Sequence, residues 1–136
     1  CDIGAIVKFI PHHNPDKLFG IIVFSEVLLE NQTTQTQVDG AFTTPIGLKG
    51  LKTEDGNYIY TVELFHDNEK VCDLTEPVFS GATIYGHEPK AANLTICGKN
   101  SIIGKTVVIK KEEEEIATAN IVGLEAFDDY YWVNNP

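Results

Sequence analysis

The chain has 136 residues, of which 43% are hydrophobic, and its formal net charge at pH 7 is -10. This length and composition predict one globular domain with a core of its own and exclude a disordered segment. The positive charges are ten scattered lysines, and no arginine occurs, so the clustered basic surface that nucleic-acid binding requires is missing. The apolar runs are too short to span a bilayer. We therefore expect neither nucleic-acid binding nor membrane insertion.

Short apolar segments separated by turn residues make up the N-terminal half of the chain. Proline, glycine and asparagine interrupt them at the intervals that are typical of turns. The segments with strand character are residues 4–10, 19–29, 42–51 and 58–65. The polar run 31–37 is expected to be a loop, Asp55-Gly56 a hairpin turn, and His66 to Glu69 another turn.

The C-terminal half continues this pattern, and no stretch has a helical period long enough to predict a helix. Strands are expected over residues 71–74, 78–85, 91–97 and 102–109, with a last strand that follows four glutamates and ends at Gly123. The glutamates, Glu112 to Glu115, are expected to be a solvated loop tip. The fold class predicted is all-β, an antiparallel sandwich or flattened barrel of about eight strands. The domain is expected over residues 1–126, followed by an aromatic, acidic tail over 127–136.

The three cysteines and two glycosylation sequons predict an extracellular protein. Cys1, Cys72 and Cys97 are an odd number, which predicts one disulfide and one free or intermolecular thiol, with the pairing left open. The sequons begin at Asn31 and Asn93. Together with the cysteine at position 1, they favour a secreted chain after signal removal.

Few residues are candidates for a metal site or for catalysis. His12 and His13 lie beside each other on a turn, and Glu63 and His66 lie at the two ends of a short segment. His12 and His13, near Asp16, could share an ion only weakly and only on a loop, because adjacent residues on a strand point to opposite faces. Glu63 and His66 with Asp67 would also bind loosely, because one imidazole with carboxylates is a weak ligand set. His66 is also too weakly linked to Cys72, six residues further on, to predict a nucleophile and its base.

A family resemblance rests on the segment Ser-Ile-Ile-Gly-Lys-Thr-Val-Val-Ile, residues 101–109, and on the final strand that ends Ile-Val-Gly at position 123. This part of the chain resembles the C-terminal half of the copper/zinc superoxide dismutases. Residues 20–24, 48–51 and 56–65 are similar to the second strand, the third strand and the copper-binding strand of that family. The resemblance implies a Greek-key sandwich like that of superoxide dismutase.

The same resemblance implies that the metal sites have been lost. The positions of the four copper-binding histidines are occupied by Thr61, Glu63, Val78 and Lys110. The loop after Val78 is too short to carry the zinc ligands, and the charged loop that guides superoxide to the metal is reduced to a lysine and four glutamates. Cys72 matches the loop cysteine of the family disulfide, but its partner position is Ala119.

The function expected is therefore not enzymatic and needs no cofactor. We expect a secreted structural or assembly module that binds a protein partner, or a second copy of itself, through an exposed sheet face. Three alternatives remain: an acidic carrier of divalent cations or a small ligand, a residual redox enzyme with a rebuilt metal site near Glu63 and His66, and an immunoglobulin-like adhesion domain.

Overall fold

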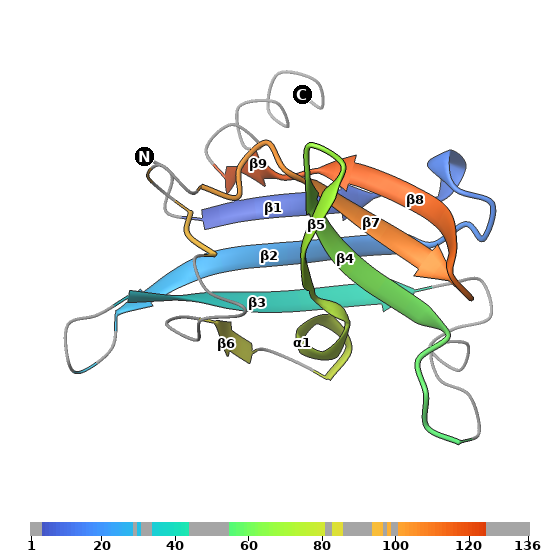
Figure 1. Cartoon of the computed structure of the whole chain (residues 1–136), viewed down its shortest axis with the longest axis horizontal. Coiled ribbons are helices and arrows are strands. Elements are labelled where there is room, and N and C mark those ends of the chain that lie inside the picture. Colours follow the sequence, from blue (N-terminus) through green and yellow to red (C-terminus); the bar gives the residue numbers. More distant parts are fainter. Residues whose placement is uncertain are drawn as a thin grey trace, which may run out of the picture.

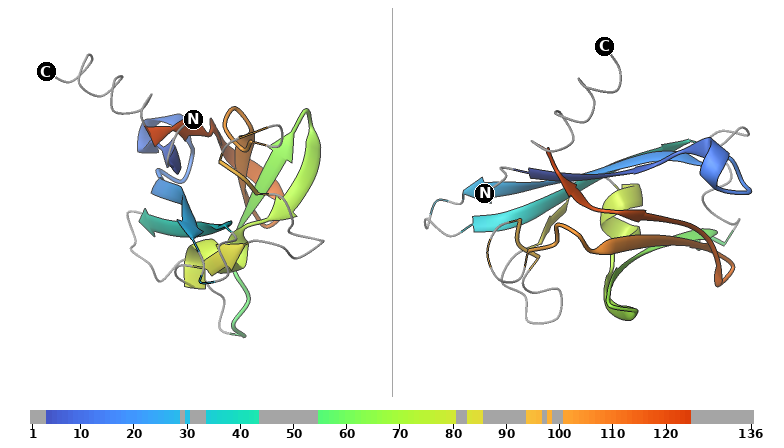
Figure 2. Two further views of the ribbon diagram at one scale, coloured as in Figure 1. Left: turned by 90° about the vertical axis from the view of Figure 1, so that its left-hand side faces the viewer. Right: turned by 90° about the horizontal axis from the view of Figure 1, so that it is seen from above.

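A computed structural model describes residues 4–28, 30, 34–43, 55–80, 83–85, 94–96, 98 and 101–124, which form two antiparallel sheets packed face to face (Figures 1 and 2). This confirms the predicted all-β sandwich. The elements are β1 (Gly4–Phe9), η1 (Pro11–His13), β2 (Phe19–Leu28), β3 (Thr34–Thr43), β4 (Tyr60–His66), β5 (Glu69–Asp73), α1 (Thr75–Ser80), β6 (Thr83–Tyr85), β7 (Thr106–Lys111), β8 (Glu114–Asn120) and β9 (Val122–Gly123).

The first sheet has the strand order β6-β3-β2-β1-β9. Its centre is the long hairpin of β2 and β3, whose ladder runs from the Phe19 pair with Thr43 to the Leu28 pair with Thr34. Ile22 and Phe24 alternate with more exposed neighbours and are completely buried, as period-two alternation requires. The same hairpin requires glycine at position 20, because a Cβ there would lie 2.2 Å from the ring of Phe42.

The second sheet has the order β5-β4-β7-β8. Val62 and Leu64 of β4 and Val107 and Ile109 of β7 are completely buried and face the first sheet. Alternate residues of these strands therefore lie on the outer face of the sheet. This outer face carries Thr61, Glu63, Phe65, Thr106, Val108 and Lys110.

Two tight turns connect the strands of this sheet. Asp67 and Asn68, between β4 and β5, have φ values of 50° and 68°, and Glu112 and Glu113, between β7 and β8, have 51° and 70°. Positive φ at both central residues is typical of a type I′ hairpin turn. The predicted turn at residues 66–69 is confirmed. So is the exposed loop tip of glutamates, although its last two residues already belong to β8.

Helix α1 packs beside β3 and β4, where it closes one side of the sandwich (Figure 1). Leu74, which precedes it, and Val78 within it are both buried in the core. Thr75 fixes its start, because the Oγ1 atom of Thr75 accepts a hydrogen bond from the Val62 amide at 2.9 Å. The strand expected over residues 78–85 was therefore wrong at 78–80, which belong to α1, whereas residues 83–85 do form strand β6. A helix of six residues is too short to show a helical period.

The third strand begins earlier than predicted. Residues 34–43 form β3, so the loop expected over 31–37 was wrong at 34–37; of the strand expected over 42–51, the structure describes only residues 42 and 43, which end β3. Thr36, Val38 and Phe42 are buried, so β3 does alternate, but a threonine occupies one inward position and the pattern looks polar. The Thr36 hydroxyl is satisfied by donating a hydrogen bond to the carbonyl of Leu94. Residues 44–54 lie outside the described part of the chain.

Two expected strands near the C-terminus are shorter or replaced. β7 begins at Thr106 and not at residue 102, because the chain turns at Gly104, which has a φ of 90°. Residues 94–96 do not form a strand, and Thr95 makes an isolated parallel bridge to Ser101. The expected tail, residues 127–136, lies outside the described residues. Within the described part, no helix is long and apolar enough to cross a membrane.

Candidate functional site

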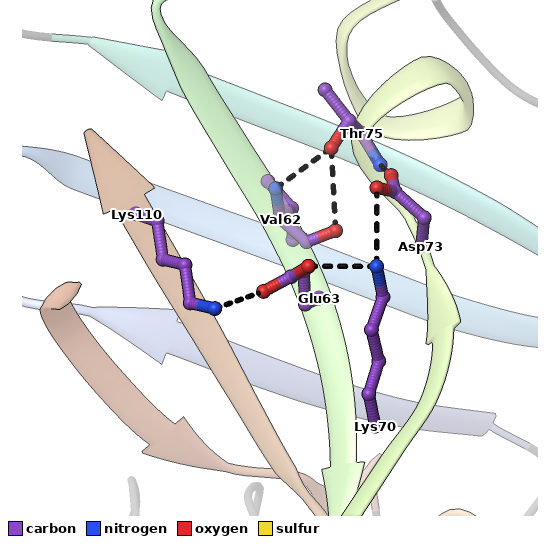
Figure 3. A network of polar contacts seen from close by, with 6 residues as sticks. All are labelled: Val62, Glu63, Lys70, Asp73, Thr75 and Lys110. Atoms are coloured by element: carbon purple, nitrogen blue, oxygen red, sulfur yellow. Dashed lines mark hydrogen bonds and ion pairs between the residues drawn. The ribbon is translucent and has the colours of Figure 1, made fainter. Parts of the chain in front are cut away.

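The most developed polar cluster of the described structure is centred on Glu63, on the outer face of β4 (Figure 3). Its Oε1 atom lies 2.8 Å from Nζ of Lys110, and its Oε2 atom lies 2.8 Å from Nζ of Lys70. Lys70 also reaches Asp73, with 3.9 Å between Nζ and Oδ2. Two carboxylates and two ammonium groups thus form one network whose formal charges cancel. We call these four residues the Glu63 network.

Strand register brings these four side chains together. Lys110 of β7 is paired with Thr61 and is therefore the diagonal neighbour of Glu63 on the outer face. On the other side, the β4–β5 ladder has a register shift between Leu64 and Phe65. That irregularity places Asp73 opposite Glu63 and Lys70 opposite Phe65, the next residue of β4 on the outer face, so Lys70 can reach the carboxylates of both Glu63 and Asp73.

The electrostatic environment holds Glu63 in its charged form. Only 11% of its side chain is exposed, and burial alone would raise the pKa of this carboxyl group. Hydrogen bonds from Lys110 and Lys70 outweigh burial, and the pKa of Glu63 is lowered. The carboxylate in turn raises the pKa of Lys70. These opposite shifts favour the charged forms of both Glu63 and Lys70 at neutral pH.

Thr61, Glu63 and Lys110 line one shallow hollow of about 450 Å³ on this face. These are three of the four positions that the family resemblance assigns to copper ligands. The fourth, Val78, lies on α1 in the hydrophobic core, so close to β3 that a Cβ at Gly40 would lie 2.7 Å from its Cγ1 atom. The three residues that do come together offer a hydroxyl, a carboxylate already engaged by two ammonium groups, and one of those ammonium groups. Such a set has poor metal-ligand chemistry, since a cation would have to displace both lysines.

The weak metal candidates are not brought into one site. His12 and His13 are exposed on η1, between β1 and β2. His66 is exposed at the end of β4, with its Nε2 atom 3.4 Å from Oδ2 of Asp67. Glu63 and His66 are three residues apart on one strand and point to opposite faces. Among the described residues, no three His, Cys, Asp or Glu side chains are grouped so that they could hold a metal ion.

Cys72 is a free thiol on β5 and not a loop residue. Burial, followed by the charge of Asp73, raises its pKa to about 11, so the thiol is protonated and unreactive at neutral pH. Cys72 pairs with Leu64, Leu64 with Val107, and Val107 with Ala119. Three strand spacings, roughly 14 Å, therefore separate Cys72 from the position that the family disulfide would use. The other disulfide candidates, Cys1 and Cys97, and the sequon residues Asn31 and Asn93 lie outside the described residues.

A second polar cluster, which the sequence analysis missed, lies where β4 meets the loop before β2. The Tyr60 hydroxyl donates a hydrogen bond of 2.7 Å to Oδ2 of Asp16, and Nζ of Lys111 lies 3.0 Å from the same oxygen. Burial and the Asp16 carboxylate raise the pKa of Tyr60 to about 12, while the Tyr60 and Lys111 contacts lower that of Asp16. Asp16 and Tyr60 are 44 residues apart in sequence, so no local pattern could have linked them.

A further depression lies beside the Glu63 network, on the outer face of β4, β7 and β8. Its volume is about 430 Å³. It is lined by Phe65, Asp67, Asn68, Thr106, Val108, Lys110, Glu115, Thr118 and Asn120. We call it the outer hollow. An exposed sheet face was predicted as a binding surface, but the residues of that face could not be named, because pairing between strands decides which residues lie on it.

Comparison of the sequence with models of known protein families and with curated proteins finds no match. The functional assignment therefore depends on the residues of this chain and on the resemblance described above.

Proposed function

We propose that this chain is a non-enzymatic, extracellular domain of the superoxide-dismutase-like Greek-key type, and that it serves as a structural or protein-binding module. In this proposal its copper and zinc sites have been lost. Its partner is another protein or a second copy of the chain, bound through an exposed sheet face.

The observation that carries the proposal is the Glu63 network. Three of the four matched copper positions adjoin one another on the outer face, as the resemblance requires for β4 and β7, yet two of them form an ion pair with each other. A carboxylate held by two ammonium groups links β4 to both β5 and β7, and loss of the carboxylate would leave both ammonium groups without it. A role in holding strands together accounts for these residues better than a role in redox chemistry does.

The electrostatics of the chain give the proposal further support. A dismutase must attract an anionic substrate, whereas this chain carries a net charge of -10 and exposes Glu112 to Glu115 at the end of the same sheet. The proposed extracellular location rests on the two sequons and the cysteine count alone.

Elemental analysis for copper and zinc, run beside a superoxide-consumption assay on the same purified protein, tests the proposal. We expect substoichiometric metal and no consumption above that of a heat-denatured sample. Stoichiometric copper together with superoxide consumption would replace the proposal by a redox enzyme with a rebuilt site.

A further inference from the structure

We propose that the outer hollow binds an extended basic segment of a partner protein, with two cationic side chains about four residues apart and an apolar side chain between them. This inference rests on the proposed role as a protein-binding module and specifies the surface and the chemistry of the partner.

The two ends of the outer hollow are acidic. Thr106 and Asn120 lie at one end of the β7–β8 ladder, and the turn that contains Asp67 is adjacent to it. Glu115 lies at the other end, opposite Lys110. At roughly 3.3 Å per residue, the four steps from Thr106 to Lys110 span about 13 Å. An extended peptide covers the same distance between residues i and i+4.

Both carboxylates are available to a partner. The side chain of Asp67 is 89% exposed, and its neighbour is the exposed imidazole of His66, at 3.4 Å. Glu115 is exposed and makes no ion pair within the described residues. Lys110 also lines the hollow, but Glu63 neutralises its charge at 2.8 Å. The carboxylates of Asp67 and Glu115 therefore give the hollow a net negative charge. A basic partner is thus favoured over a neutral or acidic one.

Two of the side chains that line the outer hollow, Val108 and Phe65, are apolar, and the others are polar or charged. Val108 is 5% exposed, and the half-buried ring of Phe65 stands beside it. That ring already has the Lys110 ammonium 5.6 Å from its centroid, so the site tolerates a cation against an aromatic face. Around the ring, Thr106 and Asn120 are joined by a hydrogen bond of 3.0 Å from the threonine hydroxyl to Oδ1, which leaves the amide nitrogen of Asn120 to donate to a peptide carbonyl.

The test uses a seven-residue peptide with arginines at its second and sixth positions, leucine between them and serine or glycine elsewhere. Binding to the whole chain is measured by isothermal titration calorimetry and by amide shifts in NMR spectra, at about 50 mM salt to preserve charge attraction. The control peptide has the same composition with its two arginines adjacent. We expect shifts at Thr106, Thr118 and Asn120, and affinity at least about fivefold higher for the spaced peptide.

A matched pair of variants separates the hollow from the general negative field of the chain. Asp67→Asn with Glu115→Gln removes two charges at the hollow, and Asp39→Asn with Glu30→Gln removes two exposed charges elsewhere. We expect the first variant to weaken the spaced peptide at least about fivefold and the second less than about twofold. Equal weakening by both variants, equal affinity for both peptides, or no binding at 1 mM peptide (roughly the limit of weak complexes) would overturn the inference.

The failure of this inference is distinguishable from the failure of the proposed function. A chain that lacks copper and superoxide activity but does not prefer the spaced peptide remains a binding module with a different surface. Copper and superoxide consumption by the same preparation would contradict the proposed function itself.

Discussion

Replacing Glu63 by glutamine should destabilise the domain at neutral pH, because it removes the charge that holds Lys70 and Lys110 on the outer face. The side chain of Lys70 is 47% exposed and that of Lys110 is 29% exposed, so both can turn toward water once the carboxylate is gone. The loss should therefore be smaller than that of a fully buried pair, which is about 3–5 kcal/mol. It should exceed the loss from a surface pair, which is below about 1 kcal/mol. We expect the free energy of unfolding to fall by about 1–2 kcal/mol and the melting temperature by roughly 3–10 °C.

The effect of Glu63→Gln should depend on pH in a defined direction. The pKa of Glu63 is lowered from 4.5 in the folded protein, so folding favours the deprotonated carboxylate. Its stabilising contribution is present above the pKa of the unfolded chain and is lost as the pH falls through the folded pKa. Urea unfolding of both proteins at pH 7 and at about pH 3 should therefore show a large difference at pH 7 and a smaller one at acid pH.

Glu115→Gln is the matched control for this prediction, because it changes the same charge at an exposed position of the same sheet. We expect it to change the free energy of unfolding by less than about 0.5 kcal/mol. If Glu63→Gln were no more destabilising than Glu115→Gln at pH 7, or if its effect were the same at both pH values, the Glu63 network would not be a stabilising element.

Three further predictions concern other parts of the domain. Tyr60→Phe removes the hydrogen bond to Asp16 and should lower the free energy of unfolding in urea by about 1 kcal/mol. Ultraviolet titration of the parent protein should show a tyrosine that ionises near pH 12, and the variant should lack this transition. If the variant kept the transition, the assignment to Tyr60 would be wrong. Glu112→Asn with Glu113→Gly supplies residues that favour the positive φ values of the β7–β8 turn and should raise the free energy of unfolding by about 1 kcal/mol, whereas destabilisation would exclude that turn type. Cys72 should react with a thiol reagent at pH 8 far more slowly in the folded protein than in urea, since its pKa is raised to about 11. Mass mapping identifies the labelled thiol. Equal rates in both conditions would show that the fold does not bury Cys72.

Sequence alone predicted the sandwich because most inward positions carry large apolar residues at period two. In β4 the alternation of Val62 and Leu64 with Thr61 and Glu63 predicted the strand, and the structure shows that Val62 and Leu64 face inward. β3 was not predicted because an inward position carries a buried threonine, whose hydroxyl donates a hydrogen bond to the carbonyl of a distant residue. α1 escaped because six residues hold less than two turns.

The candidate site was only partly predictable for a related reason. The resemblance singled out Glu63 and Lys110, but it could not show that their side chains would pair. Lys70 joins them through a register shift in the β4–β5 ladder, which no local sequence signal marks. The outer hollow depends in the same way on the lateral order of β4, β7 and β8. Lateral pairing between strands far apart in the chain was therefore the information that the sequence patterns lacked.

We propose that Thr61, Glu63 and Lys110 occupy adjoining positions of a lost copper site and carry an ion pair in place of metal ligands. Copper titration of the parent protein, beside a variant with Thr61→His, Glu63→His and Lys110→His, tests both parts of this proposal, with circular dichroism to establish that the variant folds. We predict no stoichiometric copper binding by the parent and one bound copper in the variant, since three imidazoles would then share one face of adjacent strands. One tightly bound copper in the parent protein would contradict the account, and a folded variant that binds none would show that the three positions do not form the site that the resemblance assigns.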